Sequence, residues 1–112
     1  MTLLATPIVR GIDLPGAVAA QYTCPTNQNV LLKHGVFCNH TTGTVAITVY
    51  IVPAGASPAA ANKIIDAYSI TAHTTYVSPE VSGVVLQAGD SVQCFAGSAT
   101  SIAINLSGIV QS

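Results

Sequence analysis

The sequence predicts an all-β protein: an antiparallel β-sandwich, jelly-roll-like, of about eight short strands with an N-terminal arm. Three observations lead to this prediction. Apolar and polar residues alternate over short segments, glycine and proline interrupt the chain about every ten residues, and almost no segment has a helical period. The connecting segments are short, whereas parallel strands need long crossovers. We therefore divide the 112 residues into an arm at 1–17 and a sandwich domain at 18–112.

The arm is apolar and contains two prolines, Pro7 and Pro15. Proline cannot donate a backbone hydrogen bond, so residues 3–9 are expected to form an edge strand or no strand. So apolar a segment needs a surface to lie on, either its own domain or a neighbouring molecule. An edge strand of the sandwich is the alternative to a separate arm. The residues that we expect to make the contact are Leu3, Leu4, Ile8, Val9, Arg10, Ile12 and Leu14.

The first half of the sandwich contains three expected strands. Residues 19–24 form the first and residues 30–39 the second, where Gly35 indicates a bulge or a close backbone approach. Residues 44–52 alternate most clearly and are predicted as a half-buried strand. Its inward residues are expected to be Val45, Ile47, Val49 and Ile51. The following stretch, residues 53–62, is expected to be a loop that runs between the two sheets.

Five further strands are expected in the second half, at residues 64–70, 74–77, 84–86, 91–96 and 101–107. In the last of these, Ile102, Ile104 and Leu106 are expected to point inward. The loop at residues 39–43 is predicted to close a hairpin. Two other tight connections, at residues 87–90 and 97–100, are expected to join antiparallel strands in the same way.

Charged residues are scarce: they make up 6% of the chain, against roughly 25% in an average soluble domain. The formal net charge is -1, so the chain cannot neutralise a run of phosphates and nucleic-acid binding is excluded. No apolar run approaches the ~20 residues of a membrane-spanning helix. The first residues also lack the basic segment and apolar core of a signal peptide, so we expect synthesis and assembly in a cytoplasm.

The small number of charges also bears on oligomeric state. A folded monomer of this size exposes roughly 5,800 Å². Seven charged side chains cannot cover such a surface, and half of the residues are hydrophobic. We therefore expect an oligomer or a shell component whose surface is largely covered by other subunits. The alternative is a monomer that serine and threonine keep soluble.

The chemistry-bearing residues indicate no enzyme. The carboxylates Asp13, Asp66, Glu80 and Asp90 are isolated in the sequence, and no nucleophile or phosphate-binding motif occurs. The four tyrosines could line a sugar or receptor site, but sheet faces and subunit contacts are the preferred interpretation.

The cysteines Cys24, Cys38 and Cys94 are odd in number and follow no export signal, so we expect free thiols that pack as small apolar groups. A bridge between Cys38 and Cys94, or a metal site, is the alternative. The spacing lacks the close pairs of a zinc site, so no metal and no cofactor is predicted.

Several segments carry a family resemblance, at residues 22–27, 36–39, 49–53, 62–65, 85–92 and 104–110. Together they make residues 22–110 resemble the small β-sandwich structural proteins of tailed bacteriophages, which are head decoration (cement) proteins and related tail or fibre modules. The resemblance implies a virion structural role and commonly a homotrimer. Residues 1–17 lie outside it, and the cysteines depart from its usual pattern.

The resulting expectation is a capsid decoration protein, not an enzyme. It would sit on the capsid surface of the virion, made in the host cytoplasm, and stabilise the phage head by bridging capsomers. Its partners would be two further copies of the chain and the major capsid protein, with no nucleic acid and no membrane, and residues 1–17 would contact the capsid. The alternative is a tail or head-fibre module involved in host receptor binding.

Overall fold

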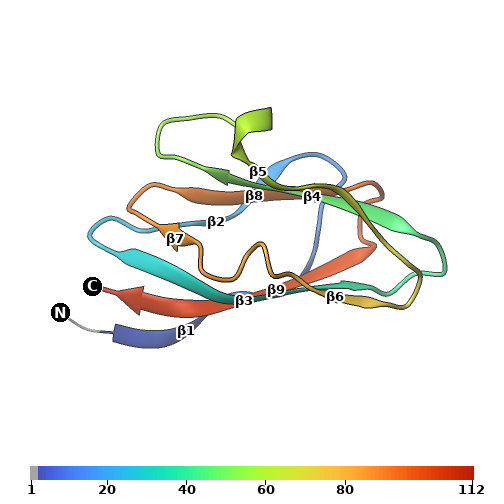
Figure 1. The fold of residues 1–112 in the computed structure, drawn as a ribbon, viewed down its shortest axis with the longest axis horizontal. Coiled ribbons are helices and arrows are strands. Elements are labelled where there is room, and N and C mark those ends of the chain that lie inside the picture. Colours follow the sequence, from blue (N-terminus) through green and yellow to red (C-terminus); the bar gives the residue numbers. More distant parts are fainter. Residues whose placement is uncertain (1–2) are drawn as a thin grey trace.

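The structure, a computed structural model, describes residues 3–112 and consists of β-strands arranged in two layers (Figure 1). The strands are β1 (Leu3–Asp13), β2 (Ala19–Thr23), β3 (Asn29–Asn39), β4 (Val45–Val52), β5 (Lys63–Ile70), β6 (Thr75–Val77), β7 (Val85–Leu86), β8 (Ser91–Ala96) and β9 (Ile102–Gln111). A single turn of 3₁₀ helix, η1 (Ala60–Asn62), precedes β5. Met1 and Thr2, which we included in the arm, lie outside the described residues.

Both sheets are antiparallel, and their inner faces pack together as a β-sandwich. The first sheet has the order β1-β9-β3-β6, and β7 also pairs with β3; the second has the order β2-β8-β4-β5. The predicted all-β antiparallel sandwich is therefore confirmed, and each expected strand is present. The last strand is longer than expected, because β9 stays paired with β3 as far as Gln111.

The connections differ from the sequence prediction. The loops after β3, β7 and β8, which we expected to close hairpins, all cross from one sheet to the other. Conversely, the long loop at residues 53–62 was expected to run between the sheets, but it joins β4 to β5 within one sheet. The physical reason is reach: four or five extended residues span ~13–18 Å, more than the ~10 Å between packed sheets. Loop length therefore does not decide which strands pair.

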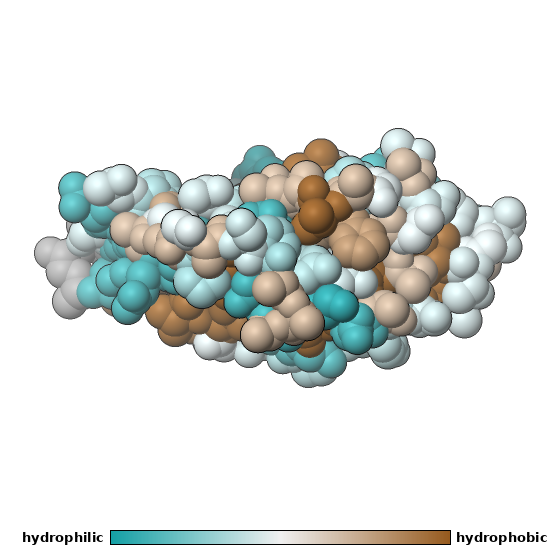
Figure 2. Space-filling model, turned by 90° about the horizontal axis from the view of Figure 1, so that it is seen from above, coloured by the Kyte–Doolittle hydropathy of each residue, from teal (hydrophilic) through white to brown (hydrophobic). Residues whose placement is uncertain are grey.

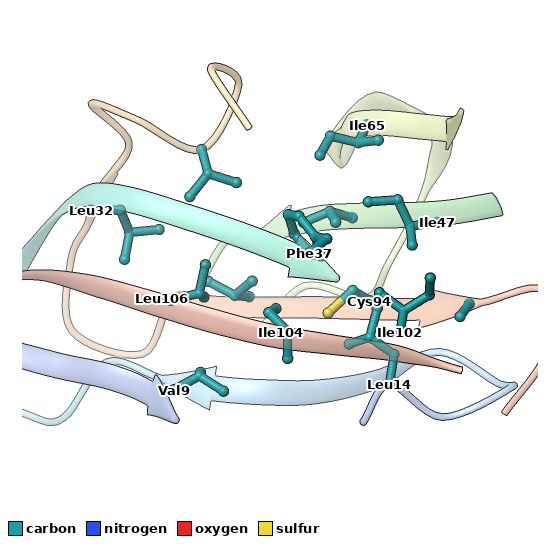
Figure 3. Close-up of a cluster of buried hydrophobic side chains, with 14 of the residues drawn as sticks. Val9, Leu14, Leu32, Phe37, Ile47, Ile65, Cys94, Ile102, Ile104 and Leu106 are labelled. Atoms are coloured by element: carbon teal, nitrogen blue, oxygen red, sulfur yellow. The ribbon is translucent and has the colours of Figure 1, made fainter. Parts of the chain in front are cut away.

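The core lies between the sheets and consists almost entirely of aliphatic side chains around Phe37 (Figure 3). Alternation predicted the inward set of β9 correctly, since Ile102, Ile104 and Leu106 are all buried. Gly35 is the predicted close approach, because a Cβ there would lie 2.9 Å from Val81 Cγ1. The interior of this part of the sandwich has no room for a larger residue at that position.

One buried polar side chain, Asn39, secures the crossing after β3. Its amide nitrogen donates to the carbonyl oxygens of Gly43 (2.8 Å) and Ile70 (2.9 Å), and its Oδ1 accepts from the backbone N–H and hydroxyl of Thr41. Asn39 is fully buried, and these bonds replace those it would make with water. The end of β3, the crossing loop and the end of β5 are thereby held together.

The N-terminal segment is an edge strand and not a separate arm. Residues 3–13 pair with β9 from Leu3↔Gln111 to Asp13↔Ala103, with register shifts on either side of Val9. Val9, which belongs to this edge strand, and Leu14, which directly follows it, are both buried in the core (Figure 3). The edge role that Pro7 indicated is therefore what the structure has, and the surface on which this segment lies is its own domain.

A chain that begins at Val18 should accordingly fail to fold, although the sequence suggested residues 18–112 as the sandwich domain. The truncation removes Val9 and Leu14 from the core, each contributing ~1.5–3 kcal/mol, and exposes the edge of β9. Circular dichroism and urea unfolding of the truncated chain would measure this. A soluble chain with a cooperative transition like that of the full chain would contradict the assignment of β1 to the domain.

Gly108 tests the packing of β9 against β3. A Cβ at this position would overlap the carbonyl oxygen of Leu31, a backbone atom that cannot move aside alone. We expect Gly108→Ala to lower the free energy of unfolding by about 1–3 kcal/mol in urea denaturation, or to prevent folding. Gly43→Ala is the matched control, since nothing lies within 4 Å of its Cβ, and it should change stability by less than about 0.5 kcal/mol. Equal effects of the two substitutions would contradict this packing.

Candidate interaction surface

The structure divides the seven residues that we expected to make an external contact. Val9 and Leu14 are buried in the core, and Ile8 packs partly against it. The exposed members are Leu3, Leu4, Arg10 and Ile12, of which Leu3 is 65% and Leu4 62% exposed. Only part of β1 is therefore available to a partner, mainly its first residues.

Leu3 lies beside an apolar row on the outer face of the first sheet, which we call the outer row. Cross-strand partners point to the same side of a sheet, and the register pairs Ala5 with Ile109, Ile109 with Leu31, and Leu31 with Val85. The chain neighbours of Leu31, Ile109 and Val85 include buried residues that point into the core, so these three point outward. The outer row thus crosses β1, β9, β3 and β7.

A shallow groove of about 320 Å³ lies along this row. Its lining consists of Leu3, Asn29, Val30, Leu31, Val85, Ile109 and Gln111. None of these side chains is charged. Val85 is 58% exposed, a high value for a valine in a strand. The groove lies at the end of the sandwich where β1 begins and β9 ends, the end that carries both termini in Figure 1.

The outer face stays nearly neutral beyond the groove. Farther along β3, Val36 pairs with Val77, which is 56% exposed, and Cys38 pairs with Thr75. Charge enters the outer face at Lys33, beside the register shift in β3, and at Asp13, whose partner Ala103 also pairs with Cys38. The uncharged part of this face, which includes the groove, can be covered by another neutral, apolar surface without the cost of desolvating ions.

The second face of the molecule is also poor in charge. In Figure 2, which looks down on the side of β5 and β8, pale and brown residues predominate and teal ones are scattered. The accessible surface of the chain is 5614 Å², close to the value expected for a monomer of this mass. Its few charges leave most of this area to neutral side chains.

Each of the four side-chain carboxylates makes a hydrogen bond or an ion pair within the chain. Asp90 accepts backbone N–H groups of Gln87 (2.9 Å) and Ala54 (3.0 Å), as its predicted turn position suggested. Asp13 lies 2.8 Å from His40 Nε2, and Asp66 accepts from Lys63 at 3.0 Å. Glu80 accepts from the hydroxyls of Tyr76 and Ser78. The exposed Lys63–Asp66 pair contributes little to stability.

The three cysteines are free thiols, as expected. Cys24 and Cys94 are buried, and burial raises the pKa of the Cys94 thiol to about 12. Burial also raises the pKa of Cys24. Cys38 is only half-buried, on the outer face of β3. Within residues 3–112, no three His, Cys, Asp or Glu side chains form a group that could hold a metal ion.

Sequence reasoning did not find the outer row, although it selected Leu3. Ile109 lies beyond the predicted end of the last strand, and Leu31 belongs to a strand that is apolar on both faces. The row becomes visible only when four strands are aligned in register. The signal in the sequence is the two-sided apolar pattern of residues 30–38, which exceeds what one buried face requires.

No family model, curated protein or solved structure matches the chain. Across residues 3–112, no helix has the length and apolar character needed to cross a membrane.

The burial of the cysteines predicts a graded reactivity. In the native protein at about pH 8, iodoacetamide should modify Cys38 first, while Cys94 stays a protonated, covered thiol and reacts at least tenfold more slowly. Peptide-resolved mass spectrometry would give the rates, and all three residues should be modified after unfolding. Equal native rates for Cys38 and Cys94, or a mass showing that they are bridged, would contradict this.

Proposed function

We propose that the chain is a virion structural protein: a capsid decoration (cement) protein that stabilises a phage head by bridging capsomers, as a homotrimer bound to the major capsid protein. The observation that carries the proposal is the uncharged outer row with its groove, on a small β-sandwich whose surface has few charges. A surface of this kind suits burial against other subunits.

The strand order supports the jelly-roll topology that the sequence predicted, and through it the proposed role. β6 and β7 pair with the same side of β3 and can be taken as one interrupted strand. The domain then has eight strands in two sheets of four, and six of its seven connections cross between the sheets. Eight-stranded, two-sheet jelly rolls are a common architecture of viral capsid proteins and of lectins.

The energetics also favour assembly. Stable association buries ~800 Å² on each partner, a modest share of the 5614 Å² that this chain exposes. Several interfaces of that size would fit on one subunit. Neutral side chains can be buried in them at a low desolvation cost, and the resulting contacts would depend little on salt.

The outer row provides a test by substitution. We expect Val85→Glu to shift the subunit equilibrium toward monomer and raise the dissociation constant at least tenfold, because a carboxylate would be buried in an apolar contact. Val18→Glu is the control, since Val18 is similarly exposed at 43% but lies outside the row. Sedimentation velocity over a hundredfold dilution would measure both. A wild-type chain that remains monomeric throughout would refute the trimer.

Location in the particle tests the decoration role directly. Cryo-electron microscopy of virions of the phage that encodes the chain should show it as regularly spaced density on the head shell, touching the major capsid protein. Density on the tail or on fibres would instead favour the receptor-binding alternative, and absence from the particle would refute both.

A further inference from the structure

A second candidate site lies where the edges of the two sheets meet, between β5 and β6. Tyr68 on β5 and Tyr76 on β6 stack with their ring centroids 4.2 Å apart. The two tyrosines help to line a hollow of about 180 Å³, which is formed by residues 68–71 and 74–76. We call this place the tyrosine seam. It shares no residue with the groove on the outer face.

The position of Tyr68 depends on a bulge in β5. Ala67, the residue before it, has a φ of +49°, an uncommon conformation for a residue with a side chain. Its N–H donates to Thr48 Oγ1 at 3.1 Å, and Thr48 is buried although alternation placed it on the outer face. Bulges of this kind re-aim a side chain and occur near binding sites. Tyr68 is 45% exposed, so part of its side chain is accessible to a ligand.

Tyr76 is held rigidly beneath its partner. Its hydroxyl donates to Glu80 Oε1 at 2.5 Å, and Ser78 donates to the same oxygen at 3.0 Å. Burial and the bond to Glu80 raise the pKa of Tyr76 to about 12, so the phenol keeps its proton at neutral pH. Its ring also packs against Phe37 of the core, with centroids 6.5 Å apart. Tyr76 is therefore held in place without a ligand, and Tyr68 stacks on it.

Hydroxyl groups border the rings. Thr71 Oγ1 and Thr74 Oγ1 lie 2.8 Å apart at the turn between β5 and β6, and Ser69, Thr75 and the apolar Ile70 also line the hollow. The turn is anchored by the His73 N–H, which donates to the Thr41 carbonyl oxygen at 3.2 Å. No lining residue is charged. Thr74 Oγ1 also donates to the Ala72 carbonyl oxygen at 3.1 Å, so the two threonine hydroxyls keep lone pairs that can accept hydrogen bonds from a polyhydroxylated ligand.

We propose that the tyrosine seam binds a neutral saccharide. One sugar ring would stack its C–H face on the exposed part of Tyr68, and its hydroxyls would donate hydrogen bonds to the hydroxyl oxygens of Thr71 and Thr74. An aromatic ring beside several uncharged hydroxyls matches this chemistry, because a pyranose has an apolar face and a polar rim. An ionic ligand finds no counter-charge in the lining. The proposal is independent of the decoration role, since it uses a different part of the surface.

Amide ¹H–¹⁵N spectra of the full chain test the site, with methyl glycosides of glucose, galactose and N-acetylglucosamine as probes. At up to about 100 mM probe, well above a millimolar dissociation constant, at least one should shift the signals of residues 68–76 in a saturable way. Signals around Val85 and Ile109, in the groove, should stay unchanged. No saturable shift with any of the three probes, or shifts outside the seam only, would overturn the proposal.

Substitutions then test the two parts of the site. Tyr68→Ala should weaken binding at least tenfold, whereas Tyr68→Phe keeps the ring and should stay within about threefold. The double substitution Thr71→Val and Thr74→Val keeps the Tyr68 ring and should also strongly weaken binding. This variant tests the site even if Tyr68→Ala does not fold. Tyr50→Ala is the control, because Tyr50 stacks on Phe95 away from the seam. Unchanged binding in the threonine variant, or equal loss in the control, would contradict the proposed contacts.

Discussion

Contact between the inner faces of the two sheets is the interaction on which the rest of this structure depends. Six of the eight connections cross from one sheet to the other, so almost every strand enters the fold opposite its chain neighbour. A crossing loop joins strands of different sheets, which share no backbone hydrogen-bond ladder, so packing between the sheets has to hold these two strands together. The buried aliphatic cluster around Phe37 supplies the driving force, and Asn39 satisfies the polar groups of one crossing. The local turns depend on this non-local packing, and not the reverse.

That dependence explains what the sequence could and could not predict. Alternation identifies a strand from its own residues, so β4 and β8 were predicted nearly to the residue. Pairing depends on partners far away in the chain, and a short loop fits a hairpin or a crossing equally well. The arm was misplaced for a similar reason: Pro7 weakens the strand pattern, while the contacts that fix it come from β9 and the core.

The candidate surfaces follow the same logic. Both consist of side chains that are unremarkable in sequence and become a site only through register. Ala5, Ile109, Leu31 and Val85 come from four strands, and Tyr68 and Tyr76 come from different sheets. Sequence reasoning noted the tyrosines individually but could not pair them. The bulge at Ala67 is equally invisible, because alanine carries no signal for a positive φ.

The two surfaces lie at opposite ends of β3, and this separation bears on how they could work together. Leu31 pairs with Val85 in the groove, whereas Cys38, seven residues along the strand, pairs with Thr75 of the seam. Seven residues of strand span ~23 Å, about half of the 45 Å length of the molecule. A chain that contacts another subunit through its groove would therefore leave the tyrosine seam in solvent. Assembly through one end and ligand binding at the other are sterically compatible, because the groove and the tyrosine seam share no residue.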